Sequence, residues 1–335
     1  MKISAIIIVY NLAQYVEEAI QSVLNQTRIP DEIIVVDDCS TDNSAEIINR
    51  HHSLVKYIRQ PRNVGALKNT WSGVLAAQGD VIAFLDGDDV WMPGKLEEME
   101  KLFLSDNNIC IASHDHIRVN ENMQVTGIID DTHLNVKRIT INYPHAEWSD
   151  QFKRSILLRK GYWFGSAYCI RKKFLRIDEF EKITASYDHT GWAYLDMTLG
   201  PFMVASNKNL IAGFVNSPLF KYRVHSSNSS ASAQTNTAML HALNRIQYTN
   251  QLTRLLIASY TRDTIIEKRY RDLDDENELL RLQYEHKKLP AIKKFFTISA
   301  TLFKARKIKK ELNRLLITTF LGTAAFVKLK KKYGV

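Results

Sequence analysis

The chain has 335 residues, 45% of them hydrophobic, which excludes an intrinsically disordered protein and allows one large domain or two. The net charge of +9 lies at one end: residues 291–335 hold twelve Lys and Arg and one Glu, a charge of +11 that leaves −2 for the remainder. A nearly neutral body with a basic end lacks the charge distribution of a nucleic-acid-binding domain, so we expect no nucleic-acid partner.

The three cysteines, Cys39, Cys110 and Cys169, lie far apart and form no Cys-x-x-Cys pair. An odd number of isolated cysteines predicts neither a disulfide framework nor a zinc site, and reduced thiols fit the cytosol. No polar cleavage region accompanies the apolar run at residues 3–9. We therefore predict a strand there rather than a signal peptide, and a cytoplasmic protein.

Residues 1–90 alternate between short apolar runs rich in β-branched residues and stretches whose apolar residues recur at helical spacing. We predict that Asn11 caps the first helix and that Gly79 ends the third. This alternation predicts a parallel sheet with helices on both faces and ligands at the carboxyl ends of its strands. The predicted strands are 3–9, 33–36, 55–58 and 81–85, and the predicted helices are about 12–25, 44–51 and 67–77.

The pattern is less regular from residue 96 onward. Residues 114–160 mix short strands with polar loops, and from about residue 237 the chain is predicted to be helical. The elements predicted between them are a helix at 96–104, strands at 109–113 and 167–170, a helix at 187–199, and short strands over 203–225 with a turn at Pro218.

An acidic stretch, Asp86-Gly87-Asp88-Asp89, follows the predicted strand at 81–85. Carboxylates gathered at the end of an apolar strand repel one another unless a hard divalent cation lies among them, and carboxylate oxygens suit Mg²⁺ or Mn²⁺. A cation held by one or two carboxylates keeps open positions that substrate phosphates commonly fill. The alternative is an acidic turn in which one aspartate caps the next helix.

Together, the motifs resemble family 2 glycosyltransferases, which have the GT-A fold, from residue 3 to about residue 230. The resemblance implies an α/β, Rossmann-like mixed sheet that is mainly parallel and flanked by helices, with a helical C-terminal extension. It implies a catalytic domain over 1–230, with a nucleotide-binding half (1–112) and an acceptor half (113–230), and a helical region over 231–335. The matching segments are 6–11, 31–42, 63–65, 86–93 and 222–225.

Two features are similar to the branch of this family that builds bacterial surface polysaccharides. They are the form Asn63-x-Gly65-x-x-x-Asn69 and the aromatic Trp91 after the acidic stretch. Two positions depart from the family pattern. Val9 stands where proline is common, and Thr70 stands where many members carry an arginine, which leaves phosphate contact from that loop open.

The resemblance implies a site for a nucleotide-diphosphate sugar. Tyr10 would stack on the nucleobase, Asp38 would accept the imino N–H of uracil or thymine, and Asn63 and Gly65 would contact the donor. Arg223 would pair with a phosphate, or instead with an acidic core residue. The alternatives for Tyr10 and Asp38 are a tyrosine at the sheet rim and a turn residue.

The same resemblance implies an Asp-x-Asp metal site for Mn²⁺ or Mg²⁺. Asp88 would bind the metal directly, and Asp86 would touch the ribose or reach the metal through water. Gly87 would let the backbone approach the ligand closely. His225 would complete the metal sphere or bind diphosphate, and its alternative is a structural histidine.

An inverting transfer needs a base that removes the proton from the attacking acceptor hydroxyl. Family members place this acid in a Glu-Asp pair about 25 residues before the Tyr-Arg-x-His segment. Asp196 holds that place, 26 residues before Tyr222, with Leu195 replacing the first acid of the pair. Asp188 is the second candidate, and the alternative for both is an acid on a helix surface.

The acceptor side is implied by an aromatic and glycine-rich segment. Gly165 and Ser166 resemble the residues that shape the donor–acceptor boundary, and Trp163 would stack on a sugar or pack in the core.

Residues 292–335 interleave apolar and basic groups. Residues 315–327 carry no charge, but thirteen residues span about 20 Å as a helix, too short to cross a bilayer of roughly 30 Å. We predict a basic amphipathic segment that lies on the inner face of the plasma membrane. The alternatives are a helix packed on the protein and a subunit contact. Membrane contact would suit an acceptor carried on a polyprenyl lipid.

The sequence thus predicts a metal-dependent, inverting glycosyltransferase that moves a sugar from a UDP- or dTDP-linked donor to a glycan or lipid-linked acceptor. One alternative is a sugar nucleotidyltransferase, which would need a glycine-rich, basic loop that residues 10–15 do not offer. The other is a non-catalytic lipid- or polyanion-binding protein, which would explain the basic end but not the ordered acids.

Overall fold

The computed structural model describes residues 1–128, 165–187, 193–207, 211–225, 228, 236–262, 264–304 and 308–320. The chain divides into two compact units. The first unit comprises Met1–Val224 and Leu255–Thr261, and the second comprises His225–Arg254 and Arg262–Val335. The predicted boundary at residue 230 between a catalytic and a C-terminal domain stays a prediction.

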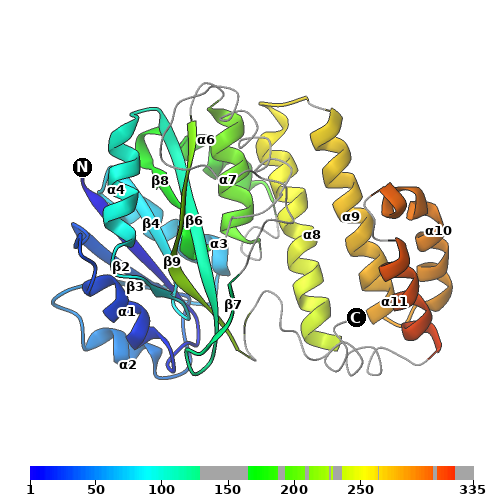
Figure 1. Ribbon diagram of the computed structural model, residues 1–335, viewed down its shortest axis with the longest axis horizontal. Helices are drawn as coiled ribbons and strands as arrows, with labels where there is room; N and C mark the ends of the chain where they lie inside the picture. Colours follow the sequence, from blue (N-terminus) through cyan, green and yellow to red (C-terminus); the bar gives the residue numbers. More distant parts are fainter. Residues whose placement is uncertain are drawn as a thin grey trace. The chain divides into compact units, whose positions relative to one another are not determined.

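The first unit is built on a mixed sheet whose amino-terminal half is parallel (Figure 1). Its parallel strands, in the spatial order β3-β2-β1-β4, are β1 (Ile3–Val9), β2 (Glu32–Asp37), β3 (Lys56–Arg59) and β4 (Val81–Asp86). The sheet continues as β8-β6-β9-β5, where the long strands β6 and β9 pair in parallel and the other pairs are antiparallel. These strands are β5 (Val90–Trp91), β6 (Ile109–Asn120), β8 (Cys169–Arg171) and β9 (Ile211–Val224), and β7 (Val125–Ile128) pairs with β6.

The apolar runs are continuous because helices cover the sheet on both faces. The helices of this unit are α1 (Val16–Leu24), α2 (Ser44–Asn49), α3 (Ala66–Ala76), α4 (Lys95–Ser105), α6 (Ile177–Ala185) and α7 (Leu195–Ser206). On one face, alternate residues of β1, such as Ile3 and Ile7, share a buried core with apolar residues of α1 and α4. On the other face, α3 lies so close that a Cβ at Gly73 would be 2.9 Å from Ile6 Cγ2. Full burial of each Ile or Val contributes about 1.5–3 kcal/mol.

The predicted fold class, an α/β mixed sheet flanked by helices, is confirmed, but the second half differs in detail. Residues 211–224 form one strand rather than several short ones, and Pro218 lies within it where the register against β6 shifts. A proline cannot donate to a ladder, so it is tolerated at such an irregularity. The predicted helix at 187–199 is instead α7, which begins at Leu195 and contains Pro201.

Two predicted helix signals act differently in the structure. Asn11 adopts a φ of 53°, and its side-chain oxygen accepts a hydrogen bond from the Thr41 amide at 2.8 Å instead of capping α1. Asn11 therefore ties the loop after β1 to the loop after β2. Gly79 does not end α3 with a left-handed turn; a Cβ there would lie 2.6 Å from the Ser4 backbone nitrogen, so the close approach of two chain segments requires glycine.

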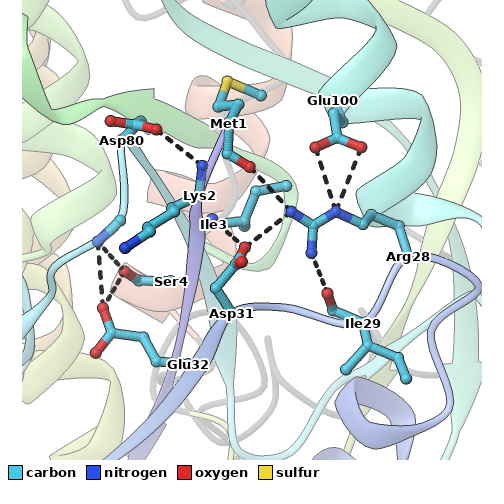
Figure 2. Close-up of polar contacts among 11 residues, drawn as sticks. Met1, Lys2, Ile3, Ser4, Arg28, Ile29, Asp31, Glu32, Asp80 and Glu100 are labelled. Atoms are coloured by element: carbon cyan, nitrogen blue, oxygen red, sulfur yellow. Dashed lines mark hydrogen bonds and ion pairs between the residues drawn. The ribbon is translucent and has the colours of Figure 1, made fainter.

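A polar cluster holds the amino-terminal ends of the parallel strands (Figure 2). The Arg28 guanidinium contacts Glu100 at 3.2 Å, Asp31 at 2.8 Å and the Met1 carbonyl at 3.0 Å. Asp31 in turn accepts the Ile3 amide at 2.8 Å. The cluster ties α4 to the start of β1, at the end of the sheet opposite the strand tips where ligands are expected.

We expect Arg28→Ala to lower the free energy of unfolding by about 1–3 kcal/mol, because the half-buried guanidinium bridges several partners. Arg50→Ala is the matched control, since Arg50 is 63% exposed and pairs with Glu46 within one helical region. That change should cost less than about 0.5 kcal/mol. Urea titration followed by circular dichroism measures both, and equal losses would show that the Arg28 cluster does not secure the strand ends.

The second unit is helical. Its helices are α8 (Asn236–Ala258), whose last residues are assigned to the first unit, α9 (Thr264–Tyr284), α10 (Lys288–Lys304) and α11 (Ile308–Phe320). His286 adopts a φ of 59° after α9, and the Lys287 amide bonds the Leu282 carbonyl at 2.9 Å, which closes the helix with a left-handed residue. None of the described helices is long and apolar enough to span a bilayer. Residues 321–335, which include about half of the predicted uncharged segment, lie outside the described residues.

Candidate active site

The acidic turn begins where β4 ends. Asp86 and Asp88 are half-buried, and the Asp89 amide donates to the Asp86 carbonyl at 3.0 Å. Gly87 donates its amide to the Ile8 carbonyl at 2.8 Å, and a Cβ at Gly87 would lie 2.8 Å from that same oxygen. Glycine is therefore required here for close approach to β1, whereas the predicted close approach to a ligand stays a prediction.

Asp89 joins three segments that are distant in sequence. Its carboxylate is 1% exposed and accepts the Ser166 hydroxyl at 2.6 Å and the Arg223 amide at 2.9 Å. Burial raises the pKa of Asp89 well above its usual value, and the negative charges of Asp88 and Asp86 raise it further. The suggested role as a cap of the following helix is not observed, because Gly94 precedes α4 and no side chain caps it.

Ser166 is the residue around which the turn is assembled. Its hydroxyl accepts the Asp86 amide at 2.9 Å while donating to Asp89. Its carbonyl accepts the Trp91 indole N–H at 3.2 Å and the Lys95 ammonium at 2.5 Å. Ser166 is fully buried behind the acidic turn, and its place at the donor–acceptor boundary stays a prediction.

Lys95 is a buried amine that the sequence reasoning missed. It is fully buried, with its nitrogen 4.1 Å from the centroid of the Trp91 ring. Burial lowers the pKa of Lys95 to about 7, although the charges of Asp89 and Asp86 favour its protonated form. No local pattern signals this contact, because the lysine opens an ordinary amphipathic helix and its partner lies 71 residues away.

We expect Ser166→Ala to lower the free energy of unfolding by about 2–4 kcal/mol, because the Asp86 amide and the Asp89 carboxylate would each lose a buried partner. Ser186→Ala removes a matched hydroxyl that is exposed and bonds one carbonyl, so it should cost less than about 0.5 kcal/mol. Thermal unfolding compares the two variants. A Ser166→Ala protein as stable as the wild type would mean that this network does not hold the turn.

Gly165 lies directly against Asp86. A Cβ at Gly165 would be 3.0 Å from Asp86 Oδ2, tighter than most van der Waals contacts. The backbone of this segment therefore fixes the wall on which the Asp86 carboxylate rests. Trp163, which was predicted to stack on a sugar, lies outside the described residues.

Arg223 supports the turn from β9. Its side chain is 3% exposed, and its Nε donates to the Asp88 carbonyl at 2.8 Å. The guanidinium also pairs with Glu18 and lies over the Tyr15 ring, 4.8 Å from its centroid. Of the two predicted partners, phosphate or an acid, the structure shows an acid. Donor contact by Arg223 stays a prediction.

Asp38 organises the loop that precedes α3. Its two carboxylate oxygens accept the Val64 amide at 2.7 Å and the Gly65 amide at 2.9 Å, and its side chain is almost buried. Burial raises the pKa of Asp38, and the two amides oppose that shift. Gly65 has a φ of 88°, which only glycine adopts freely, while Asn63 before it is exposed. Tyr10, at the end of β1, is 46% exposed.

Asp37, the residue before Asp38, has a structural role. It is fully buried and accepts the Ser40 amide at 2.9 Å and the Tyr57 hydroxyl at 2.7 Å. Burial and the bond to Asp37 raise the pKa of Tyr57. These contacts give Asp37 a structural role, whereas the nucleobase contact expected of Asp38 stays a prediction.

Asp196 lies in the first turn of α7, where its carboxylate accepts the Met197 amide at 2.8 Å. The charges of Asp196 and Asp86 both raise the pKa of the buried Tyr168, after burial itself. The two carboxylates therefore lie within electrostatic range of the same phenol. The second candidate base, Asp188, lies outside the described residues, and His225 belongs to the second unit, so its role at the metal stays a prediction.

The chemistry of the turn fits a divalent cation with few protein ligands. Among the residues that the structure describes, no group of three or more His, Cys, Asp or Glu side chains is arranged to hold a metal. A Mg²⁺ ion usually takes one or two carboxylates and completes its shell with water and substrate phosphates. Asp86 and Asp88 supply two half-buried carboxylates, and their charges are felt at Asp89, so the negative potential is concentrated here.

Comparison with known proteins agrees with these features. Residues 4–162 match the model of the glycosyl transferase family 2. An uncharacterized glycosyltransferase of Nostoc sp. is 43% identical over 118 residues, which are 34% of this chain and 36% of that protein. The putative teichuronic acid biosynthesis glycosyltransferase TuaG of Bacillus subtilis is 37% identical over 92 residues, 27% of this chain and 36% of TuaG. The match thus spans about a third of the length of these relatives.

Solved structures show a similar fold. Residues 1–349 of S. aureus TarS, crystallised in complex with UDP and with UDP-GlcNAc, superpose with a TM-score of 0.50 at 15% identity. The superposition covers 100% of this chain and 92% of TarS 1–349. At this identity the likeness concerns the fold. The likeness to the glycosyl transferase family 2 lies in residues 4–162, slightly less than half of the chain.

Proposed function

We propose that this protein is a metal-dependent, inverting glycosyltransferase that takes a sugar from a UDP- or dTDP-linked donor during synthesis of a bacterial surface polysaccharide. The observation that carries the proposal is the acidic turn at the tip of β4, inside the segment that matches glycosyl transferase family 2. Its relatives include a putative teichuronic acid biosynthesis glycosyltransferase, which supports a surface polysaccharide as product. A structural neighbour was crystallised with UDP-GlcNAc, which supports a nucleotide sugar as donor.

The donor base would lie at the tips of β1 and β2. The exposed ring of Tyr10 offers a stacking surface, and Asp38 orients the loop that carries Asn63. The Asp38 side chain is 3% exposed, so only the edge of a base can reach it. We expect its carboxylate to accept the imino N–H of uracil or thymine there while it keeps its bonds to this loop. Both bases present that N–H, so UDP and dTDP donors are both candidates.

The diphosphate would lie beside the acidic turn. Mn²⁺ or Mg²⁺ bound by Asp88, with Asp86 at the ribose or second to the metal, would neutralise charge on the leaving diphosphate. The protein's own contribution is to hold both carboxylates in place. Asp89, Ser166 and Arg223 do this through the buried hydrogen bonds around the turn.

Asp196 would serve as the base. A carboxylate near the acceptor hydroxyl takes its proton as the oxygen attacks the anomeric carbon from the face opposite the diphosphate. The place of Asp196 in the chain, 26 residues before Tyr222 and in the first turn of α7, supports this assignment.

The acceptor would be a glycan or a polyprenyl-linked saccharide at the inner face of the plasma membrane. The basic composition of residues 291–335 supports contact between the second unit and anionic lipid. Such contact would bring the active domain to a lipid-bound acceptor without a spanning helix.

A panel of nucleotide sugars tests the proposal. Slow hydrolysis of a UDP or dTDP sugar with Mn²⁺, with release of the nucleoside diphosphate, is the expected result. Pyrophosphate formation from a nucleoside triphosphate and a sugar phosphate would instead identify a nucleotidyltransferase. Binding to anionic vesicles with no nucleotide binding at all would identify a non-catalytic lipid-binding protein.

A further inference from the structure

Helix α10 has an inner apolar stripe. Ala291, Phe295, Ile298 and Leu302 recur at helical spacing and are almost fully buried. They form one cluster with Leu279 and Leu282 of α9 and Leu315 of α11. Phe295, Ile298 and Leu302 lie in the segment predicted to meet the membrane, but they belong to the core of the second unit.

The opposite side of α10 carries a second apolar pair. Leu289 is 79% exposed and Phe296 is 69% exposed. Residues 289, 293 and 296 are spaced by four and three positions, so they share one face of the helix. Phe295 and Phe296 are adjacent in sequence but point to different environments, since Phe295 is only 3% exposed. Exposed large apolar side chains that lie on one face of a helix, two turns apart, indicate an interaction surface.

The charge around this face is positive. Lys293 lies between the two apolar residues and is exposed, as is Lys288 beside Leu289. Residues 287–310 contain nine Lys and Arg and no Asp or Glu. The inward-turned Lys294 is instead bonded to Asp275 of α9 at 2.7 Å, so it belongs to the helix packing. The outer face of α10 therefore combines exposed apolar side chains with exposed basic ones.

We propose that the outer face of α10, formed by Leu289, Lys293 and Phe296 with Lys288 at its end, docks on anionic phospholipid. The apolar side chains would enter the boundary between headgroups and acyl chains, and the lysines would contact the lipid phosphates. This inference refines the membrane contact proposed above and rests on it. A second copy of the chain fits less well, because a symmetric contact would bring like charges together across the interface.

Vesicle flotation of the full chain tests this face. The probes are vesicles of phosphatidylglycerol and phosphatidylcholine, or of phosphatidylcholine alone, without nucleotide or acceptor. We expect Leu289→Ser with Phe296→Ser to weaken partitioning onto the anionic vesicles at least about 10-fold. The matched control is Leu54→Ser with Leu104→Ser, which removes two leucines that are 58% and 64% exposed in the first unit. The control should bind as the wild type does.

A second measurement does not depend on a variant losing function. In Phe296→Trp, the fluorescence added by the new tryptophan should shift to the blue on anionic vesicles and be quenched by brominated lipid. In Leu104→Trp, the added fluorescence should neither shift nor be quenched. Flotation of the double variant at wild-type level, with no quenching at position 296, would overturn the α10 surface and leave membrane contact through other residues. If the wild type floats with neither kind of vesicle, both the α10 docking surface and membrane contact in general are overturned.

Self-association is the remaining outcome. A wild type that sediments as a dimer without lipid, and as a monomer after the Leu289 and Phe296 changes, would overturn the lipid proposal in favour of a second copy. Hydrolysis of the donor sugar is read separately in each variant, so loss of the proposed enzymatic function cannot be mistaken for loss of docking.

Discussion

Asp196→Asn is expected to lower the rate of sugar transfer by about 10²-fold or more while leaving UDP binding unchanged. The carboxamide keeps the size of the side chain and an oxygen that can accept the Met197 amide, but it cannot take a proton from the acceptor hydroxyl. Steady-state transfer with a saturating donor measures kcat, and titration calorimetry with UDP and Mn²⁺ measures donor affinity.

Asp178→Asn is the control for this change. Asp178 is exposed and occupies the second position of α6, as Asp196 does in α7, so both changes remove one charge from the first turn of a helix. The effect of charge on helix stability should be alike, at under about 1 kcal/mol. If Asp196→Asn transferred sugar as fast as Asp178→Asn, Asp196 would not be the base, and Asp188 would become the candidate.

Asp88→Asn is expected to abolish the dependence of UDP binding on Mn²⁺ and to reduce transfer by at least about 10²-fold. Loss of the carboxylate removes the proposed direct ligand, so charge on the departing diphosphate is no longer neutralised. The backbone around Asp88 should persist, because Arg223 bonds its carbonyl. Calorimetry with and without Mn²⁺ gives the contribution of the metal to binding, and thermal unfolding confirms that the variant is folded.

Asp86→Asn distinguishes the role of Asp86 from that of the proposed direct metal ligand, Asp88. Asp86 rests against Gly165 and would act at the ribose or through water, so its loss should weaken UDP binding less than the loss of Asp88. Wild-type affinity and unchanged Mn²⁺ dependence in Asp88→Asn would remove the cation from the acidic turn.

The first half of the fold was predictable because its information is local. The strands β1, β2 and β4 are buried on both faces and consist of continuous apolar runs, and the helices between them show apolar residues at helical spacing. The second half was less predictable. Pro201 lies inside α7 and Pro218 inside β9, and both residues conventionally argue for a break in the element that contains them.

The supports of the site could not be inferred from the sequence. Ser166 meets Lys95 across 71 residues and Asp89 across 77, and none of the three lies in a pattern that indicates the others. Asn11 shows the same limit, since its side chain satisfies Thr41, a residue of another loop, and not the helix next to it. The ligand-facing candidates were found through motif resemblance, whereas the buried partners that hold them follow from packing alone.

The central claim is that the carboxylates at the tip of β4 bind a cation that holds the diphosphate of a sugar donor. A crystal structure with UDP and Mn²⁺, using the anomalous signal of manganese to locate the ion, tests it most directly. We predict one manganese peak bonded to the Asp88 carboxylate and to the diphosphate, with the base beside Tyr10. Manganese and UDP bound elsewhere, with Asp86 and Asp88 touching neither, would contradict the claim.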